Sequence, residues 1–207
     1  MPLQAILAGR AFTPHEEISD AVILVQDGAI VAVGRREKVM IPAKASRYDA
    51  GALSVAPGFV DVHIHGAGGH DVMEGTAEAL DAVTRTVARH GTTSLVATTV
   101  TASADETCRA AAGIAGWMKS QSAQESSTPR AEVLGIHFEG PFISPARRGV
   151  HPPEWIVPPS ADLLRTFAAA AGGAARILTL APELPGALEL ISAACQAGFV
   201  VSMGHTD

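Results

Sequence analysis

Two histidines stand two positions apart at the end of an apolar run. His63 and His65 close the segment Asp61–His65. Because side chains alternate along a strand, both imidazoles are expected on the same face, where together they can bind one divalent ion. An HxH pair also arises by chance or in ordinary core packing, so both interpretations stay open at this point.

A carboxylate and a third histidine follow further along the chain. Glu139 lies two residues after His137, just before a Gly-Pro pair that must end a strand, and His205 lies in the segment Ser202–Asp207. Taken alone, Glu139 could equally be a salt-bridged or solvated residue. Histidines and one carboxylate at the ends of three different strands, however, suit a borderline cation such as zinc.

The remaining histidines carry less weight. His15 and His90 are expected at the surface, and His70, in a glycine-rich loop, either lines the site or faces water. His137 is a candidate for orienting Glu139 or another ligand from behind. The loop 147–153, with two arginines and a histidine, is either solvated or in contact with an anionic or polyhydroxy substrate.

The elements that must position these residues are short strands that alternate with helices. From residue 54 onwards the expected strands are Val60–Ile64, Thr93–Thr99, Val133–Phe138, Ile177–Ala181 and Phe199–Met203. The expected helices are Thr76–His90, Ala104–Lys119, Ser160–Ala171 and Leu184–Ala197. Chemistry at the ends of successive strands favours a (β/α) barrel over a doubly wound sheet. We therefore expect an α/β protein with an incomplete TIM-like barrel of about five of eight units.

The first part of the chain has a different pattern. The short β-rich runs Gln4–Leu7, Ala21–Gln26 and Ala29–Val33 alternate with turn signals, and Asp27-Gly28 is a typical hairpin turn. We expect a small antiparallel β unit over residues 1–54, followed by the barrel units over residues 55–207.

Composition excludes several classes of function. The formal net charge is −6 and the 15 Lys and Arg residues are scattered, so nucleic acid is not expected as a partner. The longest apolar stretch, Ala21–Val33, is interrupted by polar residues and glycine, and Met1–Arg10 lacks the features of a signal peptide. We therefore expect no membrane partner and a cytoplasmic location.

Several segments carry a resemblance to a known family. Ala56–Gly66 resembles the opening of the barrel in the amidohydrolase superfamily. Within that superfamily the whole chain resembles the N-acetylglucosamine-6-phosphate deacetylases, through the segments Gly135–Phe142, Gly149–His151, Leu180–Glu183 and Gly204–Thr206. Dihydroorotase-like relatives use a carboxylated lysine on the fourth strand. The expected fourth strand, Ile177–Ala181, contains no lysine, which agrees with a glutamate ligand.

The resemblance implies a metal-dependent hydrolase of amino-sugar catabolism. Its expected reaction removes the N-acetyl group of N-acetylglucosamine 6-phosphate, a small-molecule partner, and yields glucosamine 6-phosphate and acetate. It implies that Glu139 and His205 are metal ligands and that His63 and His65 bind a second metal. Since some family members lack the HxH pair and hold a single metal, one or two divalent ions are expected. Zinc is the first expectation, and iron or another divalent ion is the alternative.

The same resemblance implies further features. The backbone around Val150 and the side chain of His151 would touch the sugar. Residues 1–54 would be the N-terminal part of a small β-sandwich, and the full-length protein would be a homodimer.

The resemblance also implies roles for which residues 1–207 offer no counterpart. A third ligand histidine, a phosphate-binding arginine and a catalytic aspartate are expected beyond Asp207, so the chain is expected to be truncated and inactive by itself, with no catalytic residue of its own. The alternatives are a deacetylase of N-acetylgalactosamine 6-phosphate, or an inactive fragment that acts as a binding or interaction protein.

Overall fold

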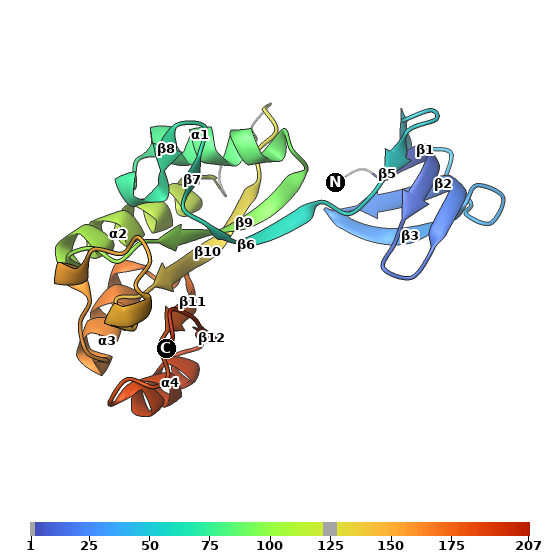
Figure 1. Cartoon of the computed structure of the whole chain (residues 1–207). Coiled ribbons are helices and arrows are strands. Elements are labelled where there is room, and N and C mark those ends of the chain that lie inside the picture. Colours follow the sequence, from blue (N-terminus) through green and yellow to red (C-terminus); the bar gives the residue numbers. More distant parts are fainter. Residues whose placement is uncertain (1–2, 122–127) are drawn as a thin grey trace. The chain divides into compact units, whose positions relative to one another are not determined.

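The computed structural model describes residues 3–121 and 128–207. The chain divides into two compact units, Met1–Gly58 and Phe59–Asp207 (Figure 1). Among the described residues, none of the helices has the length and apolar character needed to cross a bilayer.

The first unit is a small β-sheet. Its strands are β1 (Gln4–Phe12), β2 (Glu17–Gln26), β3 (Ala29–Arg35), β4 (Ser46–Asp49) and β5 (Ser54–Val55). The expected turn at Asp27 and Gly28 is present, with φ of 52° and 78°, and it joins the antiparallel strands β2 and β3. The expected antiparallel pairing of the first three strands is confirmed, whereas β4 and β5, which were not foreseen, pair parallel to β1.

Both faces of this sheet carry apolar residues. One buried cluster includes Val22 and Leu24, and the other includes Ala21 and Ile23. Successive residues of β2 therefore supply the two clusters in turn, as the alternation of side chains along a strand requires.

The second unit is built on a five-stranded parallel sheet in the order β12-β11-β10-β9-β6. Its strands are β6 (Phe59–Ile64), β9 (Thr92–Thr99), β10 (Glu132–Glu139), β11 (Ala175–Leu180) and β12 (Val200–Met203). Each strand pairs with the one before it in this unit, so the strand order never reverses. The mixed α/β class and all five expected strands are confirmed.

Four helices connect these strands and follow them in chain order along the sheet (Figure 1). They are α1 (Ala77–Ala88), α2 (Ala104–Gln121), α3 (Ala161–Ala170) and α4 (Ala187–Gln196). The Ser160 hydroxyl accepts a hydrogen bond from the Leu163 backbone N–H at 3.2 Å, which caps α3 as expected. Helix α4 begins three residues later than expected, because Gly186, with φ of 84°, is its N-cap.

Short elements between strands and helices were not foreseen. The glycine-rich segment after β6 forms a small hairpin, β7 (Gly66–Ala67) and β8 (His70–Asp71), which leads into the 3₁₀ helix η1 (Val72–Glu74). The loop after β10 contains two further 3₁₀ helices, η2 (Pro145–Arg147) and η3 (Pro153–Trp155).

The core of the second unit lies between the helices and the middle of the sheet. Phe138 on β10 is fully buried and stacks on Phe167 of α3, with ring centroids 5.3 Å apart. The strands at the two ends of the sheet are far more open, since Phe59 on β6 and Val200 on β12 are 68% and 66% exposed.

Candidate metal centre

Glu139 is the last residue of β10, the middle strand of the parallel sheet, and its side chain is buried. The Thr101 hydroxyl donates a hydrogen bond to the Glu139 carbonyl at 3.2 Å. The next residue, Gly140, has φ of 74°, and a Cβ there would lie 2.1 Å from the Thr101 hydroxyl oxygen. Only glycine fits this turn, which leads the chain away from the strand and leaves the carboxylate at the strand end.

The two histidines of the HxH pair lie beside this carboxylate, on one face as expected. The Nε2 atoms of His63 and His65 are 3.2 Å apart. They lie 3.5 Å and 3.1 Å, respectively, from Oε2 of Glu139. Nδ1 of His65 is 2.9 Å from the Thr98 carbonyl oxygen on β9, a contact that fixes the ring.

Two more histidines lie against the same carboxylate. Nε2 of His205, two residues after β12, lies 3.1 Å from Oε1 of Glu139, and its Nδ1 lies 2.8 Å from the Arg147 carbonyl oxygen. Nε2 of His151 lies 3.4 Å from Oε2 of Glu139, although His151 comes from the loop after η2 and is only 1% exposed.

The spacing of these donor atoms fits a divalent ion. In tetrahedral zinc sites the metal–ligand bonds of about 2.0–2.1 Å separate neighbouring donors by about 3.3–3.4 Å. Nε2 of His63, Nε2 of His65 and Oε2 of Glu139 are separated by 3.1–3.5 Å. Glu139 forms a second group with His151 and His205, in which the donor atoms all lie within 4.8 Å of one another. Two groups of possible ligands therefore share one carboxylate.

The carboxylate of Glu139 is ionised in this environment. Burial alone would raise its pKa, but hydrogen bonds from His151 and His65 and the charge of His63 outweigh burial and hold the pKa well below its ordinary value of 4.5. The hydrogen bond to Glu139 correspondingly raises the pKa of His65, against the opposing effect of burial. The centre is thus a negative charge surrounded by imidazoles.

The other histidines lie outside this cluster or support it. His137 is buried: its Nε2 contacts the Thr179 hydroxyl at 2.7 Å and its Nδ1 contacts the Val62 carbonyl at 3.1 Å. Its ring packs edge-on against His63, so His137 supports the HxH pair. His70 pairs with Glu74 at 3.3 Å.

The residues of the loop after β10 differ in their contacts and in their exposure. The side chain of Arg147 pairs with Asp207 at 3.0 Å, while Arg148 donates to the His151 carbonyl oxygen at 3.1 Å. Val150 is 86% exposed. Both arginines therefore hold the ends of the loop that places His151, and Val150 presents an open surface next to it.

Threonines were not foreseen as parts of the site. Thr98, Thr101 and Thr179 are buried at or near the ends of β9 and β11, and each bonds a residue of the cluster or the buried His137. The sequence signal that could have identified these threonines is a polar residue at the end of an otherwise apolar strand.

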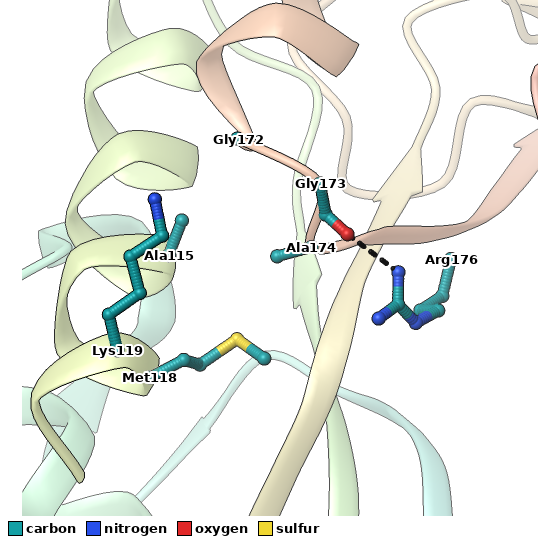
Figure 2. Close-up of a pocket in the computed structure, with 7 residues that line it drawn as sticks. All are labelled: Ala115, Met118, Lys119, Gly172, Gly173, Ala174 and Arg176. Carbon is teal, nitrogen blue, oxygen red and sulfur yellow. Dashed lines mark hydrogen bonds between the residues drawn. The ribbon is translucent and has the colours of Figure 1, made fainter. Parts of the chain in front are cut away.

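A pocket of about 270 Å³ lies elsewhere on the second unit, between the last turns of α2 and the turn that precedes β11 (Figure 2). Arg176 lines it and donates to the Gly173 carbonyl oxygen at 2.9 Å. Since Arg176 stands near the amino end of β11, this pocket is separate from the cluster at the carboxyl ends of the strands.

Known proteins are similar to this chain in sequence. The chain is 37% identical over 195 residues to the N-acetylglucosamine-6-phosphate deacetylase of Bacillus subtilis (strain 168), covering 94% of this chain and 48% of that relative. It is 34% identical over 199 residues to the N-acetylgalactosamine-6-phosphate deacetylase of Escherichia coli O157:H7, covering 96% of this chain and 49% of that relative. The chain spans about half the length of the curated relatives it matches.

A solved structure is similar over the whole chain. It is a mutant of the N-acetyl-D-glucosamine-6-phosphate deacetylase from Mycobacterium smegmatis in complex with N-acetyl-D-glucosamine-6-phosphate, with a TM-score of 0.84 and 32% identity, and this chain covers 50% of it. The parallel sheet thus corresponds to a curled half-barrel of a deacetylase structure. The profile of the Amidohydrolase family matches residues 54–203, and the chain therefore belongs to the amidohydrolase family.

Proposed function

We propose that the whole protein is a metal-dependent deacetylase that hydrolyses N-acetylglucosamine 6-phosphate to glucosamine 6-phosphate and acetate in amino-sugar catabolism. The observation that carries the proposal is one buried, ionised carboxylate, Glu139, faced by imidazoles at the carboxyl ends of a parallel sheet. The names of the relatives support the substrate class, since most of those described share this activity.

The proposal assigns the metal ligands as follows. Glu139 and His205 hold one divalent ion, and His63 and His65, together with Glu139, hold a second. Zinc suits this set of imidazole and carboxylate donors, and iron is the alternative. A divalent ion bound there lowers the pKa of a bound water to about 7 and polarises the acetamide carbonyl of the substrate.

The chain's own residues prepare the site for this chemistry. Glu139 supplies the negative charge that attracts the cation. The backbone around Val150 and the side chain of His151 are proposed to contact the sugar, next to the carboxylate. No general acid or base is assigned within residues 1–207.

The proposal extends to architecture. Residues 55–207 are proposed to be five of the eight units of a TIM-like barrel, and residues 1–54 part of a small β-sandwich. The match of this chain to half of a deacetylase structure, at a TM-score of 0.84, supports this. A homodimer is proposed from the same resemblance, and a cytoplasmic location is proposed from the sequence features described above.

The test is an assay of acetate release by the purified whole protein, and not by residues 1–207 alone, after chelation and reloading with Zn²⁺. N-acetylglucosamine 6-phosphate and N-acetylgalactosamine 6-phosphate are compared as substrates. We expect release that depends on the metal and is faster for the gluco epimer. Faster release from the galacto epimer would favour the alternative substrate, and metal binding without release from either substrate would contradict the proposal. His70→Gln is the matched control, because it removes a histidine that pairs with Glu74 outside the cluster.

A further inference from the structure

His205 has an unusual backbone conformation. Its φ is 52°, in the left-handed region that residues other than glycine rarely adopt. Such a conformation persists only where the surrounding structure holds it. The residue before it, Gly204, is held by a hydrogen bond from its backbone N–H to the Leu180 carbonyl oxygen at 3.1 Å. The direction of the His205 ring therefore depends on what holds the chain that follows.

Glu183 bonds the two residues that follow His205. It is exposed and lies in the turn between β11 and α4. The Thr206 hydroxyl donates to its Oε2 at 2.6 Å, and the Asp207 backbone N–H donates to its Oε1 at 2.9 Å. These two bonds hold the pKa of Glu183 below its ordinary value of 4.5, so both oxygens belong to an ionised carboxylate. Hydrogen bonds to an ionised acceptor are stronger than those between neutral groups.

The loop after β10 bonds His205 itself. The backbone N–H of Ser144, which is buried, donates to the His205 carbonyl oxygen at 2.9 Å. Nδ1 of the His205 ring lies 2.8 Å from the Arg147 carbonyl oxygen. Both contacts require the chain after His205 to keep its course, and Glu183 is the side chain that bonds this part of the chain at two adjacent residues.

We propose that Glu183 is a positioning residue, which holds His205 in its left-handed conformation and so keeps the ring directed at Glu139. Arg147 also pairs with Asp207, but these side chains are 62% and 54% exposed, and an exposed ion pair contributes little. Glu183 differs because it bonds a backbone N–H and the neighbouring hydroxyl together. The consequence for metal binding rests on the proposed function, whereas the holding of the His205 backbone does not.

The positioning is tested on the metal-free whole protein by hydrogen exchange of the Ser144 amide, followed by NMR. Glu183→Gln turns one acceptor oxygen into an NH₂ group, which cannot accept from either donor. The Ser144 amide should then exchange roughly tenfold faster, because its acceptor, the His205 carbonyl oxygen, is less firmly held. Glu189→Gln is the matched control, at an exposed position in the first turn of α4, and should leave the rate unchanged. An unchanged Ser144 rate in Glu183→Gln would overturn the proposal.

A pair of substitutions at Thr206 separates the hydrogen bond from the shape of the side chain. Thr206→Val removes the hydroxyl with little change in shape, and Thr206→Ser keeps it. Exchange of the Ser144 amide should be faster in Thr206→Val and close to that of the unaltered protein in Thr206→Ser. Thr206→Val should add little to Glu183→Gln, because both substitutions remove the same contact. Equal rates in the two Thr206 variants, or fully additive effects, would contradict the proposal.

The consequence for metal is measured by titrating the whole protein with Co²⁺ against a competing chelator. Glu183→Gln should weaken the ion held by Glu139 and His205 by roughly 10–100-fold, as is typical of residues behind a ligand. The ion at His63 and His65 and the melting temperature should change little, because Glu183 is exposed and away from that pair. His205→Gln identifies the affected ion, since it should lose it.

Equal weakening of both ions, or a melting temperature lowered as far as in a core variant, would show that Glu183 supports the fold in general, and the proposal would fail. If the unaltered whole protein binds no Co²⁺, the proposed function fails. The exchange rate of the Ser144 amide then still decides whether Glu183 holds His205.

Discussion

The middle and the two ends of the parallel sheet differ sharply in burial, yet both supply the candidate metal centre. On β10 the last five residues are all buried, whereas β6 has no buried residue and Met203 on β12 is 73% exposed. Glu139 comes from the buried middle, and the HxH histidines and His205 come from the open ends. Packing fixes the carboxylate, while hydrogen bonds to backbone carbonyls fix His65 and His205.

The largest predicted effect of this difference in burial is on the stability of the protein. Phe138→Ala, in the middle strand, should lower the free energy of unfolding by about 3–5 kcal/mol, because it opens a cavity beside Phe167. Phe59→Ala, on the end strand and 68% exposed, should change it by about 0.5 kcal/mol or less. Urea denaturation of both variants measures the difference. Equal losses would show that the two regions are equally packed in solution.

Metal affinity should distinguish the shared ligand from an end-strand ligand. Glu139→Gln removes the carboxylate common to both groups, so affinity at both positions should fall by more than the roughly 100-fold that residues behind a ligand account for. His63→Gln should weaken only one of two bound ions. Competition with a chelator, followed by metal analysis, gives both values. Two ions retained in Glu139→Gln would contradict the shared role of this carboxylate.

The loss of a polar side chain should likewise cost more stability at a buried position than at an exposed one. Thr179→Val leaves Nε2 of the buried His137 without its partner at 2.7 Å and should cost about 1–3 kcal/mol. Thr93→Val, at an exposed position near the start of β9, is the matched control and should cost about 0.5 kcal/mol or less. Thermal or urea unfolding measures both. A neutral Thr179→Val would mean that water replaces the lost contact.

The smallest expected effect is a pH dependence of the metal-free protein. The lowered pKa of Glu139 gives stability that is present above 4.5 and is lost as the pH falls through the folded-state value. The raised pKa of His65 gives stability that is complete below 6.5 and is lost as the pH rises through the folded-state value. Their contact should therefore stabilise the protein most between these two values.

The measurement is the difference in unfolding free energy between the unaltered protein and Glu139→Gln across the acid and neutral range. The effect should be small, because the side chain of His65 is 36% exposed and water screens the contact. A difference that grows steadily above neutral pH would contradict this assignment.

Much of the second unit could be predicted from the sequence because its signals are local. The apolar runs and helix-capping residues placed five strands and four helices within a few residues of their observed ends, and the alternation of side chains put His63 and His65 on one face. The unit before Phe59 was less predictable, since the parallel pairing of β4 and β5 with β1 joins segments more than forty residues apart.

The sequence by itself determined which residue types stand at the ends of successive strands, and so the class of chemistry. Only the tertiary structure decided that His151, from a loop, is buried against Glu139, that His137 supports the HxH pair, and that Thr101 bonds both Glu139 and His151. The physical reason is that the partners of a buried ring are groups brought close by nonlocal packing. Residue spacing along the chain does not contain that information.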